Sequence, residues 1–113
     1  MKEQEKIAPG KPAEMKEVRL VLPLKRKWFL AIGRGEKTVE YRKFGYYWAV
    51  RLQRINPGDI IEFRLGYSAV NTIHAKFVGM DVGSCPYEGF DGDYYRIKFE
   101  VIEKGGFRKG GEA

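Results

Sequence analysis

Residues 35–42 of this 113-residue chain read Gly-Glu-Lys-Thr-Val-Glu-Tyr-Arg, and they mark a junction between a helix and a strand. Glycines at positions 33 and 35 supply a natural helix stop. The β-branched and aromatic residues that follow alternate with polar ones, which is typical of a half-buried strand. In such a strand Glu40 and Arg42 point to the same face, and Lys37 lies at the strand mouth. The pattern therefore predicts that these three charged side chains gather around one hollow.

The flanking sequence predicts further short strands and two short helices. Helical spacing of apolar residues indicates helices over 25–32, with Trp28 on the core face, and from residue 47 onward. A mobile loop is expected over 79–93, which holds four glycines and a proline. Alternating apolar residues predict strands over 18–22, ended by Pro23, and over 37–43, 61–65, 72–78 and 95–101.

These elements indicate a β-rich α+β fold. Five or six short strands with two short helices would leave exposed edges in one flat sheet, so a small closed or nearly closed β-barrel is expected. An α+β sandwich is the alternative. The ordered domain is expected to span 17–104, between a disordered leader over 1–16 and a flexible, glycine-rich tail over 105–113.

The composition excludes several classes of protein. A single cysteine, Cys85, rules out an internal disulfide and is expected to be inert. Together with the one histidine, His74, it cannot supply a structural zinc site, so no metal and no cofactor is expected. Because the sequence shows neither a signal peptide nor an apolar run near 18 residues, we expect a cytoplasmic protein without a membrane partner.

Positive charge is concentrated around the 35–42 stretch. Residues 25–54 hold nine Lys or Arg and two Glu, whereas residues 55–104 hold five basic and eight acidic side chains. Such asymmetry favours a polyanionic partner, nucleic acid above all, although ordinary solubilising charge is the alternative. The side chains expected to contact a nucleic-acid backbone are Arg26, Lys27, Arg34, Lys43, Arg51 and Arg54.

The spacing of Gly35, Lys37, Glu40 and Arg42 resembles the hallmark of ASCH domains, small β-barrels similar to the PUA domains of RNA-modifying proteins. The resemblance extends over nearly the whole expected domain, including residues 22–24, 57–59 and 94–97. It implies an association with RNA and a cleft sized for a nucleotide. Further residues expected to bind a ligand at or beside this cleft are Arg42, Tyr46, Tyr47, Tyr67, Ser68 and Arg96.

Two functions follow from this resemblance. In the first, the domain binds RNA or a modified nucleotide, with Glu40 accepting from the amino edge of a cytosine-like base. In the second, it is a small metal-independent hydrolase, either an N4-acetylcytidine amidohydrolase or a ribonuclease, in which Lys37 activates or performs the attack and Glu40 assists. The sequence departs from the deacetylase group, because Glu40 stands where that group has threonine.

The sequence also leaves plainer interpretations open. The spacing of Glu40 and Arg42 is equally typical of a surface ion pair without a function. A third function is that of a protein-interaction domain, which no particular residue indicates. Whether the protein is an enzyme, and its oligomeric state, stay open.

Overall fold

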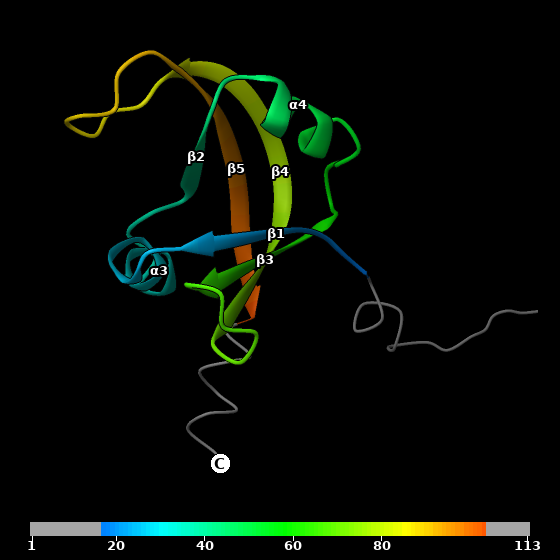
Figure 1. Cartoon of the computed structure of the whole chain (residues 1–113). Helices are drawn as coiled ribbons and strands as arrows, with labels where there is room; N and C mark the ends of the chain where they lie inside the picture. Colours follow the sequence, from blue (N-terminus) through cyan, green and yellow to red (C-terminus); the bar gives the residue numbers. More distant parts are fainter. Residues whose placement is uncertain (1–16, 104–113) are drawn as a thin grey trace, which may run out of the picture.

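The protein has a small β-rich α+β fold, shown in Figure 1, in a computed structural model that describes residues 17–103. The leader and the tail expected at the two ends lie outside the described residues. Within them the chain forms five strands and two helices. In chain order these are β1 (Val18–Leu24), α3 (Arg26–Gly33), β2 (Val39–Lys43), α4 (Tyr46–Leu52), β3 (Ile60–Leu65), β4 (Thr72–Ser84) and β5 (Asp93–Glu103).

The five strands belong to one sheet in the order β1-β3-β4-β5-β2. β1 runs parallel to β3, and the other three pairings are antiparallel. The predicted closed barrel is not confirmed, because within residues 17–103 no backbone ladder joins the end strands β1 and β2. The sheet is nevertheless strongly bent, and Figure 1 shows β1 and β3 running across the long β4 and β5.

One face of the bent sheet forms the core. Alternating residues of β1, β3, β4 and β5 turn inward, as the period of two in a strand requires. The helices close this face from different ends of the sheet (Figure 1), with Phe29 and Ile32 entering from α3 and Leu52 from α4. The largest completely buried side chains are Phe29, Phe63, Leu22, Ile32, Ile61, Ile73 and Ile97.

Two predicted boundaries are wrong, and both concern residues usually taken as breakers. β1 continues through Pro23 to Leu24. Because β1 is an end strand, the amide hydrogen that proline lacks is not needed by a neighbouring strand. The predicted mobile loop over 79–93 is too long, since β4 continues to Ser84 and β5 begins at Asp93, which leaves only 85–92 as the connection.

The Arg96 side chain explains why position 83, inside β4, is a glycine. A Cβ atom built on Gly83 would lie 2.7 Å from the Cζ atom of Arg96, whose guanidinium crosses the strand there. Arg96 in turn donates from Nε to Oδ1 of Asp81 at 2.7 Å. The glycine therefore makes room for an ion pair on the outer face rather than for a turn.

The predicted helices are confirmed with small shifts in their ends, but Trp28 lies outside the buried core. Its ring is only partly buried, against the edge of the core, while Phe29 takes the fully buried position. Neither helix in residues 17–103 has the length and apolar character needed to cross a bilayer.

Candidate functional site

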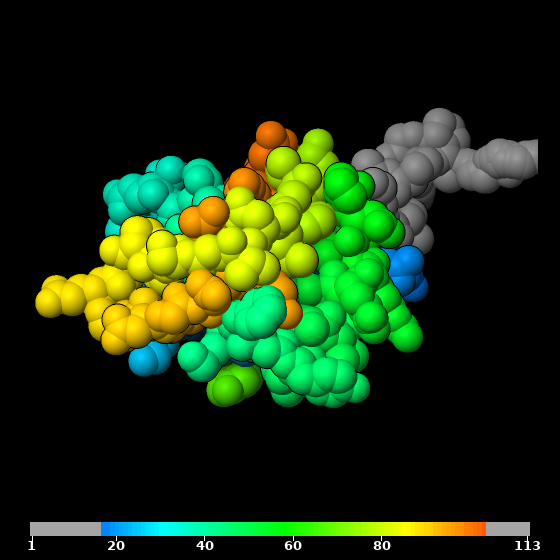
Figure 2. Space-filling view, turned by 90° about the horizontal axis from the view of Figure 1, so that it is seen from above, coloured from blue at the N-terminus to red at the C-terminus, as the bar shows by residue number. Residues whose placement is uncertain are grey.

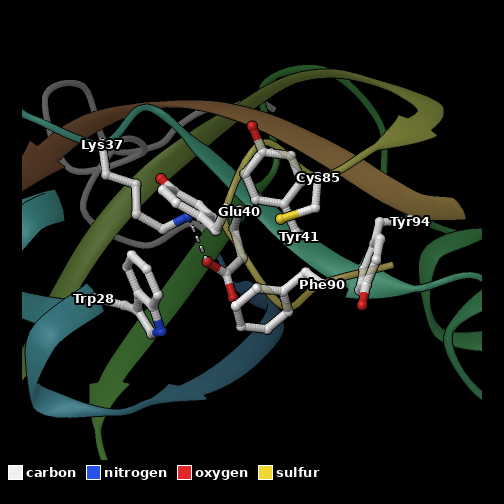
Figure 3. Close-up of a pocket in the computed structure, with 8 residues that line it drawn as sticks. Trp28, Lys37, Glu40, Tyr41, Cys85, Phe90 and Tyr94 are labelled. Atoms are coloured by element: carbon white, nitrogen blue, oxygen red, sulfur yellow. Dashed lines mark ion pairs between the residues drawn. The ribbon is translucent and has the colours of Figure 1, made fainter. Parts of the chain in front are cut away.

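A small pocket opens beside the start of β2, at the 35–42 stretch. Its walls come from α3, from β2 and from the connection between β4 and β5, which projects at one end of the molecule (Figure 2). The pocket has a volume of about 60 Å³. We call it the aromatic pocket, and its lining residues, drawn in Figure 3, are Trp28, Lys37, Glu40, Tyr41, Cys85, Tyr87, Phe90 and Tyr94.

The end of α3 positions Lys37. Gly35 has a φ of +80°, a left-handed conformation that glycine adopts without the Cβ clash of other residues. This turn lets the amides of Glu36 and Lys37 both donate to the Ala31 carbonyl, at 2.9 and 3.2 Å. The chain then enters β2, and the Lys37 side chain turns back toward the helix. The helix stop expected from the glycines therefore sets the orientation of the lysine.

Lys37, Glu40 and Arg42 form a buried ion triad centred on the carboxylate. Glu40 Oε1 lies 3.2 Å from Lys37 Nζ, and Glu40 Oε2 lies 2.9 Å from Arg42 Nη2. The exposed fractions of the three side chains are 4% for Lys37, 8% for Glu40 and 17% for Arg42. As predicted, Glu40 and Arg42 share one face of β2, because they lie opposite the buried residues Ile97 and Tyr95 of β5. The plain surface ion pair does not describe this arrangement.

Arg42 stands behind the pocket rather than on its wall. Its Nη2 atom also donates to the Pro23 carbonyl at 3.0 Å, so one side chain of β2 reaches the backbone of β1. Its guanidinium carbon lies 5.0 Å from the centroid of the Trp48 ring, and its buried Nε has no hydrogen-bond partner among the described residues. Arg42 therefore anchors Glu40 and bridges the two end strands of the sheet.

The Lys37 ammonium lies among aromatic rings. Its Nζ atom is 4.8 Å from the ring centroid of Tyr41, 5.3 Å from that of Tyr87 and 5.4 Å from that of Trp28. The same nitrogen donates to the Val39 carbonyl at 2.5 Å. Such cages usually receive a ligand cation, but here the protein's own cation fills the cage. The pocket is therefore unsuited to a second cation.

The loop over 85–92 closes the pocket through aromatic rings that pack at an angle to one another. Tyr87 packs at 4.6 Å from Trp28 and edge-on at 5.7 Å from Tyr41, measured between ring centroids. Burial raises the pKa of the Tyr87 phenol above its usual value, and the electrostatic effect of the neighbouring Cys85 raises it further. The pKa of Tyr41 is raised too, by burial first and then by the neighbouring Tyr87. Both phenols therefore stay protonated at neutral pH and can donate a hydrogen bond.

Several side chains expected at the cleft lie elsewhere. Tyr67 is 89% exposed in the turn between β3 and β4, and the Ser68 hydroxyl accepts hydrogen bonds from the amides of Val70 and Asn71 within that turn. Arg96 lies opposite Tyr41 on the outer face and is held by Asp81. None of these three predicted residues lines the aromatic pocket.

Tyr46 and Tyr47 lie on α4, near a second recess that neither of them lines. Tyr46 is 84% and Tyr47 59% exposed, and neither lines the aromatic pocket. Beside them is a wider recess of about 440 Å³, which we call the arginine groove. Its lining residues are Arg19, Val50, Arg51, Arg54 and Ile55.

The other basic residues predicted to contact nucleic acid are dispersed. Arg26 and Lys27 are exposed on α3, where the Lys27 ammonium lies 4.7 Å from the Trp28 ring centroid. Arg34 pairs with the adjacent Glu36 through Nε and Oε2 at 3.0 Å. Lys43 is exposed at the end of β2, 5.7 Å from the ring centroid of Tyr94. Of the six predicted backbone contacts, only Arg51 and Arg54 line either of these two recesses.

The sequence did not assign the pocket walls formed by Trp28, Cys85, Tyr87 and Phe90. A signal that could have found them is the density of aromatic residues in and directly after the predicted mobile loop, where Tyr87, Phe90 and Tyr94 occur within eight positions. Mobile loops seldom carry so many large rings. Across residues 17–103, no three His, Cys, Asp or Glu side chains gather as metal ligands would.

Fold and pocket together describe a small β-rich α+β domain with a charged, aromatic pocket at the edge of its sheet. The crystal structure of hypothetical protein PH0355 is similar, with a TM-score of 0.51 and 19% sequence identity over 74% of this chain and 98% of that one. At this identity the likeness concerns the fold alone. No family model matches the sequence, and no curated protein matches it.

Proposed function

We propose that this protein is an ASCH-type, PUA-like domain that recognises RNA or a modified nucleotide through a single base in the aromatic pocket. The observation that carries the proposal is that Lys37 and Glu40, two residues of the ASCH-like spacing, line one pocket together with five aromatic rings. A bent five-stranded sheet with two helices is compatible with a PUA-like barrel that lacks one closing ladder.

The hydrogen-bonding groups of the pocket favour a base with an amino group beside an acceptor. An ammonium has three donors, and Lys37 directs two of them to Val39 and Glu40. The third is left for a ring nitrogen or carbonyl oxygen of a ligand. Each carboxylate oxygen of Glu40 pairs with one cation, Oε1 with Lys37 and Oε2 with Arg42. Each oxygen keeps a further lone pair that can accept a hydrogen bond from an exocyclic amine. Cytosine and adenine present this donor–acceptor edge, whereas uracil does not.

The size of the pocket fits the edge of a base rather than a whole nucleotide. A volume of about 60 Å³ has room for about four water-sized groups. Complete ligand sites are usually about 300 Å³ or more. The sugar and phosphate would therefore remain outside, past Phe90, which is 41% exposed at the rim.

A small metal-independent hydrolase is the second candidate, because the Lys37 amine itself faces the pocket. Its pairing with Glu40 favours the binding function, since an ammonium held by a carboxylate positions a ligand and lacks the lone pair needed for attack. The acyl group of N4-acetylcytidine would enter the same pocket in either case.

The test compares nucleosides and pocket variants. Cytidine, N4-acetylcytidine, adenosine and uridine are titrated into the protein by calorimetry, and the mixtures are then analysed for products by chromatography. We expect cytidine to bind more tightly than uridine by about 1–3 kcal/mol. Lys37→Met and Tyr87→Ala should abolish this preference, whereas Tyr67→Ala, at an exposed position away from the pocket, should preserve it.

Each outcome separates the functions. Equal affinity for cytidine and uridine, or unchanged binding by Lys37→Met, refutes base recognition in this pocket. Conversion of N4-acetylcytidine to cytidine by the unmodified protein, lost in a folded Lys37→Met variant, identifies the hydrolase.

A further inference from the structure

The arginine groove is separate from the aromatic pocket and differs from it in chemistry. Its lining residues come from the start of β1, from α4 and from the residues just after α4, and none of them lines the aromatic pocket. Three of its five lining side chains are guanidinium groups, and none is a carboxylate. At about 440 Å³ it has the size of a ligand-binding cleft.

The arginines of the groove carry little compensating charge. Arg19 has Glu17 at 3.7 Å, and both side chains are more than half exposed. Arg54 makes no hydrogen bond or ion pair with another residue of the described part of the chain. Like charges that share a concave surface raise the local positive potential, which an anionic ligand would relieve.

Arg51 is held by contacts with its own helix. Its Nη1 atom donates to the Tyr47 carbonyl one helical turn earlier, at 3.0 Å. Its guanidinium carbon lies 3.6 Å from the centroid of the Tyr47 ring, so the two groups stack. One planar face of the guanidinium is thereby covered by the protein, and because Arg51 is exposed, the group is within reach of a flat partner such as a base.

The surroundings favour a polynucleotide over other polyanions. A lipid surface requires an exposed, convex patch, whereas these arginines line a recess. A purely acidic peptide such as polyglutamate would use the charges but has no ring to stack on the exposed Tyr47. A single-stranded nucleic acid uses both, since arginines bind its phosphates and planar side chains stack on its bases.

We infer that the arginine groove binds the phosphate backbone of single-stranded RNA, as a second contact away from the aromatic pocket. The choice of RNA rests on the proposed function, but the groove itself does not depend on the aromatic pocket. The domain would then hold one base through Lys37 and Glu40 and hold neighbouring phosphates through Arg19, Arg51 and Arg54. Binding of an oligonucleotide therefore depends on salt and on the groove, whereas binding of a nucleoside does not.

The experiment measures anisotropy of a labelled, mixed-sequence single-stranded RNA at several salt concentrations. The test variant is Arg19→Gln with Arg54→Gln, because both side chains are exposed and Arg51 is left in place. The control variant is Lys76→Gln with Lys98→Gln, which removes the same charge from the outer face of β4 and β5, where both lysines are exposed. Uncharged cytidine is titrated into all three proteins in parallel.

We expect the groove variant to bind RNA about tenfold more weakly than the unmodified protein. The slope of log K against log salt should fall by about 1.4, the release of two phosphate contacts on a single strand. The control variant should differ by less than about twofold in affinity. Equal weakening of the two variants overturns the inference, because it shows that only net charge matters.

Two further results separate the groove from the pocket and from other partners. Groove-dependent RNA binding without any cytidine binding supports the groove and refutes the base pocket. If polyglutamate binds as tightly as RNA and with the same dependence on the groove, the assignment to nucleic acid is wrong. NMR of the arginine Nε–Hε groups of the unmodified protein provides a check that needs no variant, because RNA must shift the signals of Arg19, Arg51 and Arg54.

Discussion

The ion triad predicts an unequal cost for removing its members. Glu40→Gln leaves the cations of Lys37 and Arg42, 4% and 17% exposed, without their counter-charge. Removing one partner of a buried ion pair costs about 3–5 kcal/mol. Because Arg42 keeps its bond to the Pro23 carbonyl and some contact with solvent, we expect the lower end, about 3 kcal/mol. Lys37→Met should cost less, about 1–2 kcal/mol, because Glu40 keeps its 2.9 Å contact with Arg42.

Urea unfolding followed by circular dichroism measures these differences, and the matched control is Glu36→Gln. Glu36 lies four residues away, pairs with Arg34 and is 60% exposed, so its loss should change the free energy of unfolding by less than about 0.5 kcal/mol. A loss of about 3 kcal/mol lowers Tm by about 12 °C or more in a domain of this size. The reasoning is refuted if Glu40→Gln stays within about 1 kcal/mol of the unmodified protein, or if Lys37→Met costs more than Glu40→Gln.

Two further predictions concern the outer face of β4 and β5. Hydrogen bonds from Arg96, and then from Lys98, lower the pKa of Asp81 to about 2, so its contribution to stability is present above the unfolded pKa of about 3.9 and is lost as the pH falls through 2. The difference in Tm between the unmodified protein and Asp81→Asn should therefore shrink between pH 4 and pH 2, and a difference that does not change with pH would contradict this. Gly83→Ala should displace the Arg96 guanidinium and lower Tm by a few degrees, whereas Gly79→Ala, where an added Cβ meets nothing within 4 Å, should lack this steric cost. The effect of Gly83→Ala should disappear in an Arg96→Ala background, and its persistence there would show that another contact is responsible.

Local sequence signals were sufficient to predict the helix–strand junction. The alternation in 37–43 correctly predicted that Glu40 and Arg42 share one face. The glycines before it correctly predicted the end of α3, just before Lys37. Such features depend on neighbours within a few residues, which the sequence displays directly. The face of β2 that is buried, and hence the burial of the triad, depends on β5, more than 50 residues later.

The failures concern long-range contacts. Glycine is a residue type typical of loops, and only the position of Arg96 across the strand shows that a Cβ at position 83 would displace the guanidinium. Trp28 has the spacing of a core residue with Leu24 and Ile32. It becomes a pocket wall only because Tyr87, from a distant loop, packs against its ring. The length of β4 and the role of Trp28 as a pocket wall were therefore not predictable from local pattern.

The contact between Arg42 and the Pro23 carbonyl has a consequence for the width of the aromatic pocket. β1 leads into the helix that carries Trp28, whereas β2 carries Glu40 and Tyr41, so the seam between the two end strands also separates the two walls. A side chain with several rotatable bonds spans this seam, and within the described residues a backbone ladder does not. The position of the Trp28 wall relative to the Glu40 wall therefore depends on side-chain contacts such as this one and not on a pairing of the two end strands.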